Sequence, residues 1–405
     1  MIKNHITYNP FSDWQFAFAK AKESYIWDDR GTKYIDFTSG WNVTNLGWNH
    51  PDIQKAMLQQ VRKNMYAPMW TSDPMQEQYA KTLLSYMPTG IDVVCRATGG
   101  TEANEMAIKI ARAATGRKKI IGFKDTYHGQ LFAALALGAS ASDTAEIAPL
   151  VSQFIQLEYP KTTQNAKEDE KKLALFAEML DKTLRDRDVA AMVCEPEMVT
   201  GWGSCWVGVP GLIKTIRELT TKYGTLLVLD EVGTGFSRTG KLFGFQHSGV
   251  IPDMLTFAKG ISNGGAAIGA VVTTSAILAP VQSQTHLIST FGWTPVACAA
   301  ANATLQTHVR EKTWEMAERK GEVIRIMLQQ ELKHTGLVKD IRGLGMEIGL
   351  EFTDNLASKV AEHAMKHGLH TVMGGSAILQ LMPPLTIPDD ILAKGLEILI
   401  SSVKR

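Results

Sequence analysis

The sequence predicts an α/β fold in which a large domain with a mostly parallel sheet is joined to a smaller α+β domain. The chain has 405 residues, more than one ordinary hydrophobic core holds. From about residue 50 to 290, helical patterns alternate with short apolar, β-branched runs, which is typical of parallel strands joined by helices. After about residue 300, the pattern changes to a long helix with charged faces, followed by shorter strands.

Four apolar runs mark strands of the predicted sheet. They cover residues 119–123, 190–194, 225–229 and 254–258. Further along the chain we expect strands around 345–352 and 379–387 and a final helix from about Asp389. The expected domain bounds are 46–295 for the large domain and 1–45 plus 296–405 for the small domain.

Charge and composition narrow the class of protein. Lys plus Arg number 42 and Asp plus Glu 41, a net charge of +1, so neither nucleic acid nor an anionic membrane is an expected partner. The first ten residues have no apolar signal core and no apolar stretch reaches the roughly 18 residues of a membrane span, so we expect a cytoplasmic protein. The four cysteines form no CxxC pair, which favours reduced structural thiols over disulfides or a metal site. An enzyme acting on small molecules fits these features.

Two charged residues terminate neighbouring strands of the predicted sheet. Asp230 follows residues 225–229, and Lys259 follows residues 254–258. Open α/β sheets bind ligands at this edge. An aspartate that keeps a pyridinium nitrogen protonated and a lysine that forms a Schiff base suit pyridoxal 5′-phosphate. A plain ion pair at the sheet edge explains the two residues equally well.

A glycine turn supplies a candidate phosphate site. Thr98-Gly99-Gly100-Thr101 precedes a helical pattern, and backbone N–H groups at a helix N-terminus attract anions. Such a turn is more often only a loop. Tyr127 follows the next strand, where its ring either covers a cofactor face or packs in the core.

The order and spacing of these and other segments carry a resemblance: the chain resembles the class III, or subgroup II, aminotransferases of pyridoxal-phosphate fold type I. The segments are DFTSG at 36–40, NLGWNHP at 45–51, GTEANE at 100–105, YHG at 127–129, EP at 195–196, DEV at 230–232, AKG at 258–260, TFGWTP at 290–295, IRGLG at 341–345 and PPL at 383–385. The resemblance implies a seven-stranded, mostly parallel sheet in the large domain and pyridoxal phosphate as cofactor.

The resemblance also implies a role for individual residues. The implied roles are phosphate binding for Gly100 and Thr101, ring stacking for Tyr127, contact with the ring nitrogen for Asp230, packing beneath the ring for Val232 and the Schiff base for Lys259. Thr290 is implied to reach the phosphate of the neighbouring subunit, which predicts a homodimer with shared active sites. Glu195 is expected to support the cofactor site rather than transfer protons, and His128 either orients the site or is an ordinary loop histidine.

Several positions depart from the family pattern. Gly233 replaces a glutamine that contacts the cofactor's ring oxygen. Gln130 and Gln380 replace two substrate-binding arginines of ornithine-type members, and Thr200 replaces the glutamate that gates one of them. These changes argue against an ornithine, acetylornithine or 4-aminobutyrate aminotransferase that uses 2-oxoglutarate. Trp41 is either an aromatic wall of the substrate pocket or a core residue.

The sequence therefore predicts an aminotransferase that moves an amino group between an amine or amino acid and a keto acid by a ping-pong mechanism through Lys259. A racemase, epimerase or aminomutase on the same fold is the alternative, because the same carbanion chemistry serves all of them. A binding or scaffolding subunit without activity is a third interpretation. Neither the donor nor the acceptor follows from the sequence, and Arg96 or Arg238 can compensate for the missing arginines.

Overall fold

The computed structural model describes residues 16–140 and 144–405 of the chain. Its largest sheet has seven strands in the order β4-β12-β11-β10-β7-β5-β6. Their bounds are β4 Val93–Ala97, β5 Lys119–Phe123, β6 Phe154–Leu157, β7 Val189–Cys194, β10 Leu226–Asp230, β11 Met254–Phe257 and β12 Gly269–Thr273. Only β12 runs antiparallel to its neighbours. The predicted mostly parallel sheet of seven strands is confirmed.

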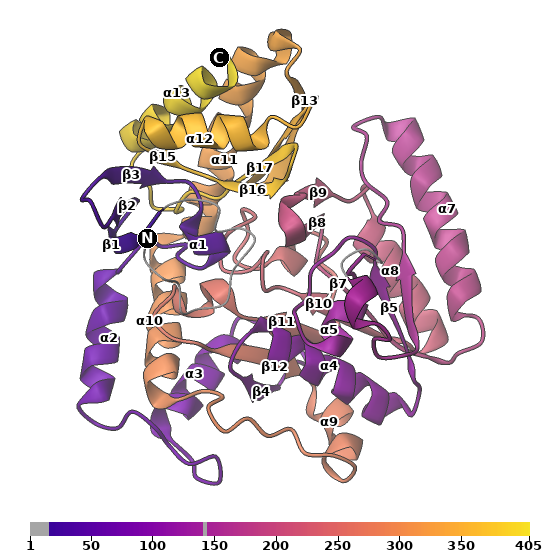
Figure 1. Cartoon of the computed structure of the whole chain (residues 1–405). Coiled ribbons are helices and arrows are strands. Elements are labelled where there is room, and N and C mark those ends of the chain that lie inside the picture. Colours follow the sequence, from indigo (N-terminus) through magenta and orange to yellow (C-terminus); the bar gives the residue numbers. More distant parts are fainter. Residues whose placement is uncertain (1–15, 141–143) are drawn as a thin grey trace.

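Helices cover both faces of this sheet (Figure 1). They include α3 Pro74–Leu84, α4 Gly100–Thr115, α7 Ala166–Leu184, α8 Leu212–Tyr223 and α10 Pro295–Glu311. Successive residues of a strand point to opposite faces, so Val228 packs in one apolar cluster with α4 while Leu227 and Leu229 pack in another with α7, α8 and α10. The strands are apolar on both faces because both faces are buried.

A second core lies in the C-terminal part of the chain (Figure 1, yellow). Its four-stranded sheet has the order β13-β14-β17-β16, with bounds β13 Val338–Leu344, β14 Glu347–Phe352, β16 Val372–Gly375 and β17 Ile378–Leu381. Three helices pack on it, α11 Thr313–Leu332, α12 Ala357–Lys366 and α13 Asp389–Val403. Ile35 and Phe37, from the N-terminal part, join the same cluster.

The N-terminal elements link the two cores. A sheet of four strands, β1 Phe18–Lys22, β2 Tyr25–Asp28, β3 Lys33–Asp36 and β15 Leu369–His370, joins both ends of the chain. It leads into α1 Ser39–Asn42 and α2 Pro51–Val61. Ala297 and Leu305 of α10 belong to a core of the large sheet, and the second core takes its first helix from α11. The domain boundaries expected from the sequence stay predictions.

Arg238 bridges the two cores through hydrogen bonds. Its side chain is fully buried, and burial lowers its pKa to about 10. Nη1 donates to the backbone carbonyls of Met346 at 3.1 Å and Pro383 at 2.8 Å, both in the C-terminal part. Nη2 donates to Asn45 Oδ1 at 2.6 Å and lies 3.4 Å from Ser39 Oγ.

Across the described ranges, no helix combines the length and apolar character needed to cross a membrane.

Candidate active site

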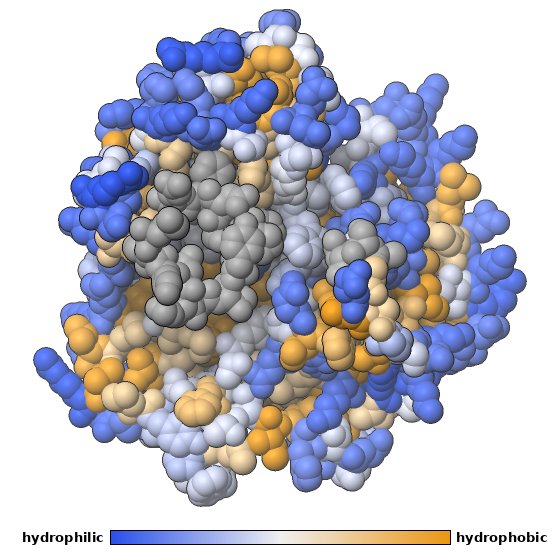
Figure 2. Space-filling model, in the orientation of Figure 1, coloured by the Kyte–Doolittle hydropathy of each residue, from blue (hydrophilic) through white to orange (hydrophobic). Residues whose placement is uncertain are grey.

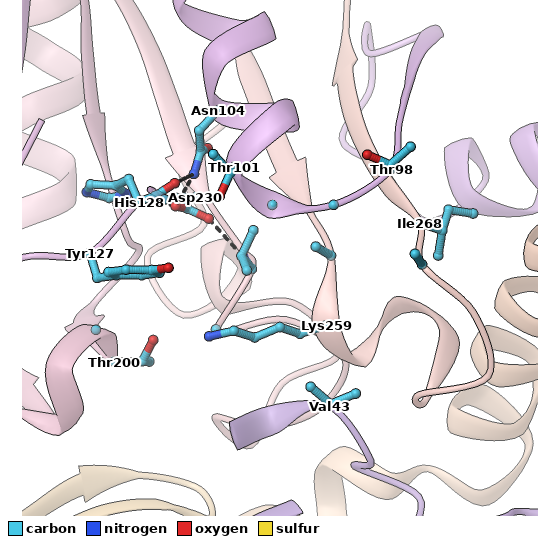
Figure 3. A pocket seen from close by; sticks show the side chains of 18 of the residues that line it. Val43, Thr98, Thr101, Asn104, Tyr127, His128, Thr200, Asp230, Lys259 and Ile268 are labelled. Atoms are coloured by element: carbon cyan, nitrogen blue, oxygen red, sulfur yellow. Dashed lines mark hydrogen bonds and ion pairs between the residues drawn. The ribbon is translucent and has the colours of Figure 1, made fainter. Parts of the chain in front are cut away.

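Most of the predicted cofactor-site residues gather in a cavity at the carboxyl ends of the parallel strands (Figure 3). Its volume is about 430 Å³, within the range of small-molecule pockets. Loops that follow β4, β5, β7, β10 and β11 supply most of its lining. The lining includes Val43, Thr98, Gly99, Gly100, Thr101, Asn104, Tyr127, His128, Gly129, Glu195, Thr200, Asp230, Val232, Gly233 and Lys259.

Asp230, the last residue of β10, forms the floor of the cavity and has four hydrogen-bonding partners. Its Oδ1 accepts from the backbone N–H of Val232 at 2.9 Å and from the Thr256 hydroxyl at 3.2 Å. Its Oδ2 accepts from Asn104 Nδ2 at 2.8 Å and lies 2.7 Å from His128 Nδ1. Burial alone would raise the pKa of this carboxyl, but the His128 contact and the other donors outweigh burial and lower the pKa. Asp230 is therefore a fixed carboxylate at neutral pH.

His128 is the ionic partner of Asp230. Its ring is buried, which alone would lower its pKa, but the hydrogen bond to Asp230 and the charge of that carboxylate raise the pKa above its usual value. The histidine is itself held in place because its backbone carbonyl accepts from Asn104 Nδ2 at 2.7 Å. The structure places the His128 ring in the cavity lining against Asp230, and its role in orienting the site stays a prediction.

Lys259 begins a short 3₁₀ turn one residue after β11. Its φ of 45° lies in the left-handed region, where a residue with a side chain is strained, and such strain is frequent at functional sites. Figure 3 shows its side chain extending across the cavity toward Tyr127 and Thr200. It is the one lysine or arginine in the cavity lining among the described residues. Because Asp230 pairs with His128, the two strand-end residues do not form the plain ion pair that the sequence also allowed.

The glycine turn has no side chains at Gly99 and Gly100, where it lines the cavity. Gly99 precedes α4 and Gly100 begins it, so the first N–H groups of the helix have no partners within the helix. A Cβ on Gly100 would lie 3.0 Å from a methyl carbon of Val232. At Gly129 the φ is 142°, and a Cβ there would lie 2.6 Å from the Thr101 hydroxyl oxygen. Backbone N–H groups and one hydroxyl thus form a cradle suited to a phosphate.

The Tyr127 ring is held in place from behind. A Cβ on Gly201 would lie 2.7 Å from Tyr127 Cβ, so the loop after β8 (Met198–Val199) packs directly against this residue. The Trp202 ring meets the Tyr127 ring edge-on, with centroids 5.1 Å apart. Tyr127 therefore presents a fixed aromatic ring to the cavity, as a flat cofactor requires.

Glu195 and Thr200 form a hydrogen-bonded pair at the cavity wall. The backbone N–H of Thr200 donates to both carboxyl oxygens of Glu195, at 3.0 and 3.1 Å, and its hydroxyl donates to Oε1. Burial and the charge of Asp230 raise the pKa of Glu195 to about 7, although His128 and Thr200 act in the opposite direction. Glu195 is thus a carboxyl that holds a proton in the neutral range.

Gln380 does not line the cavity but lies behind the Thr200 loop. It is fully buried, and its Nε2 donates to the Thr200 carbonyl at 3.2 Å and to Glu347 Oε1. Glu347 is also fully buried and accepts from Asn42 Nδ2 at 2.6 Å and from Cys205 Sγ at 3.5 Å. Burial raises the pKa of Glu347, and the charge of the more distant Arg238 only partly offsets this.

The other substrate residues predicted from the sequence lie outside the cavity lining. Gln130 is exposed, and its backbone N–H is 3.4 Å from the Thr101 hydroxyl. Trp41 is half-buried, with a φ of 68°, and Val43 lines the cavity in its place. Thr290 is exposed and contributes nothing to the cavity of its own chain.

Neither arginine named as a possible compensator reaches the cavity lining. Arg96 donates to Gln76 Oε1 and to the Met69 carbonyl, both at 3.2 Å. The guanidinium of Arg238 is occupied by the contacts that join the two cores. Both groups are committed to structural roles.

Two residues of this network, Asn104 and Glu347, were not predicted from the sequence. Asn104 bridges Asp230, the His128 carbonyl and the Thr256 hydroxyl, with bonds of 2.8, 2.7 and 2.8 Å. It lies on the buried face of α4, and a polar residue among the apolar positions of an amphipathic helix was the available signal. Glu347 gave no such signal.

The arrangement fits pyridoxal phosphate. An ionised Asp230 at the floor suits a protonated ring nitrogen, the bare turn at Gly100 and Thr101 suits the phosphate, and Lys259 suits the carbonyl. A Cβ on Gly99 would meet no atom within 4 Å, so the turn is open at this residue.

The chain is similar to known proteins along nearly its whole length. The sequence model of the class-III aminotransferase family matches residues 8–403. The acetylornithine aminotransferase of Methanopyrus kandleri is 32% identical over 398 residues, covering 98% of this chain and 96% of that protein. Among solved structures, an (S)-enantioselective omega-transaminase from Thermomicrobium roseum has a TM-score of 0.90 at 28% identity, covering 100% of this chain and 96% of that one. The ornithine aminotransferase from Toxoplasma gondii, with partial occupancy of pyridoxal phosphate at its active site, has a TM-score of 0.88 at 27% identity, covering 97% and 91%.

Proposed function

The chain belongs to the class-III aminotransferase family, and from that premise we propose that it is a transaminase selective for substrates that bring no second carboxylate into the pocket. Its cofactor is pyridoxal phosphate, and its substrates are amino acids or amines and keto acids. The selectivity is the part that we propose. It predicts weak use of 2-oxoglutarate and better use of a monocarboxylate acceptor such as pyruvate.

The observation that carries this proposal is the absence of arginine from the cavity lining among the described residues. A bidentate arginine contributes about 1.5–3 kcal/mol to carboxylate binding, whereas Gln380 offers only a neutral amide. That amide is already donated to the Thr200 carbonyl and to Glu347. The buried carboxyl group of Glu347, beside Gln380, opposes the negative charge of a second substrate carboxylate instead of attracting it.

The proposed roles of the residues follow from their positions. When bound, pyridoxal phosphate supplies a carbonyl for the amine and a ring that withdraws electrons. Asp230 would hold the proton at the ring nitrogen, and His128 and Asn104 would keep that carboxylate ionised and oriented. Lys259 Nζ would hold the cofactor covalently and then move the proton between the substrate carbon and the carbonyl carbon of the cofactor. Tyr127 would exclude water from one face of the ring.

A comparison of kcat/KM for pyruvate and 2-oxoglutarate with a common amino donor tests the substrate proposal. We expect pyruvate to be preferred by about tenfold or more. A strong preference for 2-oxoglutarate would mean that a cation outside the described cavity lining binds the second carboxylate. Inversion of an amino acid centre with no keto acid present would indicate a racemase or epimerase instead.

We also propose a homodimer in which Thr290 completes the phosphate site of the partner chain. Thr290 is exposed, and its neighbour Phe291 has 64% of its surface exposed and packs on Tyr66 with ring centroids 5.8 Å apart. Figure 2 shows further apolar surface over α2, where Leu58 and Val61 are exposed. An apolar surface of this kind suits burial against another chain.

Subunit mixing tests the dimer. Lys259→Ala and Thr290→Ala chains should both be impaired alone, and their heterodimer should regain activity because one of its two sites carries neither change. If verified subunit exchange restores no activity although each single variant is impaired, each chain completes its own site.

A cytoplasmic location also stays a proposal, which the four buried, unpaired cysteines support.

A further inference from the structure

Gly233 lies where any larger residue would collide with Thr200. A Cβ on Gly233 would be 2.0 Å from the Thr200 hydroxyl oxygen and 3.2 Å from Glu195 Oε1. The φ of Gly233 is not in the left-handed region, so the backbone does not require glycine here. Glycine is needed for space, and that space is filled by the hydroxyl of Thr200.

Thr200 and Glu195 are a rigid polar pair on this side of the cavity. Both line it, and only 3% and 4% of their surfaces are exposed. Three hydrogen bonds from Thr200 hold the carboxyl of Glu195, and Gln380 donates to the Thr200 carbonyl from behind. The pair therefore cannot turn away from the cavity without breaking several buried contacts.

The shape of the cofactor places its ring oxygen on the same side. In pyridoxal phosphate, the ring nitrogen and the carbonyl lie at opposite ends of the ring, and the phosphate arm and the ring oxygen flank the carbonyl on opposite sides. With the nitrogen at Asp230, the carbonyl at Lys259 and the phosphate at the glycine turn, the oxygen faces away from that turn. In Figure 3, Thr200 lies across the cavity from Thr98, which begins the turn.

We propose that Thr200 and Glu195 together are the hydrogen-bonding partner of the cofactor's ring oxygen in this enzyme. The proposal rests on the cofactor positions given under the proposed function. The Thr200 hydroxyl has one proton, which it donates to Glu195 when that carboxyl is ionised. When Glu195 is protonated, it donates to Thr200 instead, and the hydroxyl proton becomes available to the ring oxygen.

The charges around Glu195 favour the protonated form. Asp230 and burial raise its pKa to about 7, and the imidazolium of His128 opposes them. In this form the pair is a donor toward an oxygen that carries negative charge. Thr200 would thus contact the cofactor directly, without itself carrying a proton to or from the substrate.

Substitutions at Thr200 test the proposal through the cofactor itself. Thr200→Val keeps the shape but removes the hydroxyl, whereas Thr200→Ser keeps the hydroxyl. We expect Thr200→Val to raise the dissociation constant of pyridoxal phosphate, titrated into cofactor-free protein, by about five- to tenfold. Thr200→Ser should stay within about twofold.

The pH dependence of the visible absorption band of the bound cofactor is the second measurement. A donor stabilises the ring oxygen most after the Schiff-base proton has left, so loss of the donor should raise the midpoint of the transition. We expect a rise of about one pH unit in Thr200→Val and none in Thr200→Ser. Thr220→Val, a buried threonine of α8 outside the cavity, is the matched control and should change neither value.

The glycine supplies an independent variant if Thr200→Val fails to fold. Gly233→Ala should weaken cofactor binding by displacing Thr200, and Gly233→Ala with Thr200→Gly should relieve the overlap while the midpoint stays raised. An unchanged midpoint in both Thr200→Val and the double variant would overturn the proposal. Wild-type transamination in the same preparations would show that the proposed function had not failed with it.

Discussion

Two regions at the cavity differ in how completely their polar atoms are hydrogen-bonded. One is the floor around Asp230, and the other lies behind the outer wall that Glu195 and Thr200 form. At the floor, both oxygens of Asp230 and both polar atoms of the Asn104 amide have partners, and Nε2 of His128 is buried without one among the described residues. Behind the outer wall, Gln380 Oε1 and Asn42 Oδ1 are buried without a hydrogen-bond partner among the described residues. A carboxylate that is hydrogen-bonded at both oxygens is held in one geometry, whereas an amide with an unpaired oxygen tolerates alternatives. The comparison separates the part that serves one cofactor from the part that sets substrate choice.

Removal of the floor's reactive group should have the largest effect. We expect Lys259→Ala to lower kcat/KM for transamination by about a thousandfold or more, because the covalent link and the proton carrier are lost together. The protein should stay folded, since Asp230 keeps its partners. Steady-state kinetics and circular dichroism check both points, with the exposed Lys214→Ala as control. Near-normal turnover would contradict the assignment of Lys259.

Neutralising the floor should come next. Asp230→Asn leaves His128 buried without its ionic partner and places two amide groups against each other at Asn104. We expect the free energy of unfolding of the cofactor-free protein to fall by about 3 kcal/mol, and transamination to fall by about a hundredfold or more. Denaturant unfolding and kinetics measure these losses. Asp354→Asn, at an exposed position, should change neither, and equal losses there would point to a general effect.

The same contrast explains what the sequence predicted. Asp230 and Lys259 were recognisable because each ends an apolar run, and the rule for strand ends of parallel sheets converts that position into a site. Four strands of the large sheet, the final helix from Asp389 and the glycine turn before α4 follow from local patterns in the same way, whereas the count of seven strands was implied by the resemblance.

The outer wall was not predictable in this way. Glu347 begins β14 and looks like an ordinary polar strand residue, yet it is buried against Asn42, 305 positions away in the chain. Gln380 was noticed only because a resemblance made it unusual, and its actual partners come from two separate segments. Burial produced by packing between the two cores has no periodic signal in either segment.

Glu231, the residue after Asp230, makes the stability of the fold depend on pH. Glu231 is buried, and its pKa is raised to about 7 by burial, although Thr234 and the backbone N–H groups of Gly244 and Phe245 donate to it. The folded protein therefore holds this proton more tightly than the unfolded chain, so its contribution to stability is full below about pH 4.5 and is lost as the pH rises through about 7.

We expect the wild-type protein, free of cofactor, to lose about 2 kcal/mol more stability than Glu231→Gln between pH 5 and pH 8. The relevant quantity is the change with pH, because the substitution also alters hydrogen bonds at every pH. Denaturant unfolding at several pH values measures it. Parallel pH profiles would mean that Glu231 is already ionised in the folded state at pH 5.

Changes at the outer wall should have the smallest effect. In Gln380→Arg, the new cation lies beside Glu347, which would bind it. We expect Gln380→Arg with Glu347→Gln to raise the ratio of kcat/KM for 2-oxoglutarate over pyruvate by about tenfold, and Gln380→Arg alone to raise it less. Gln330→Arg on the exposed face of α11 controls for added charge. If the two arginine variants behave alike, Glu347 does not compete for the cation.

Arg238 has a consequence for the exchange of parts between related enzymes. Among the described residues of the C-terminal part, its guanidinium hydrogen-bonds only to the main-chain carbonyls of Met346 and Pro383. Main-chain acceptors do not depend on side-chain identity. A chimera with a C-terminal part from a related enzyme would therefore keep these Arg238 hydrogen bonds, provided that the two carbonyls kept their positions. A single-residue deletion between Met346 and Pro383 would instead displace an acceptor of Nη1 and leave that buried N–H group unpaired, so the fold accepts wide sequence drift in that part more readily than a shift of its frame.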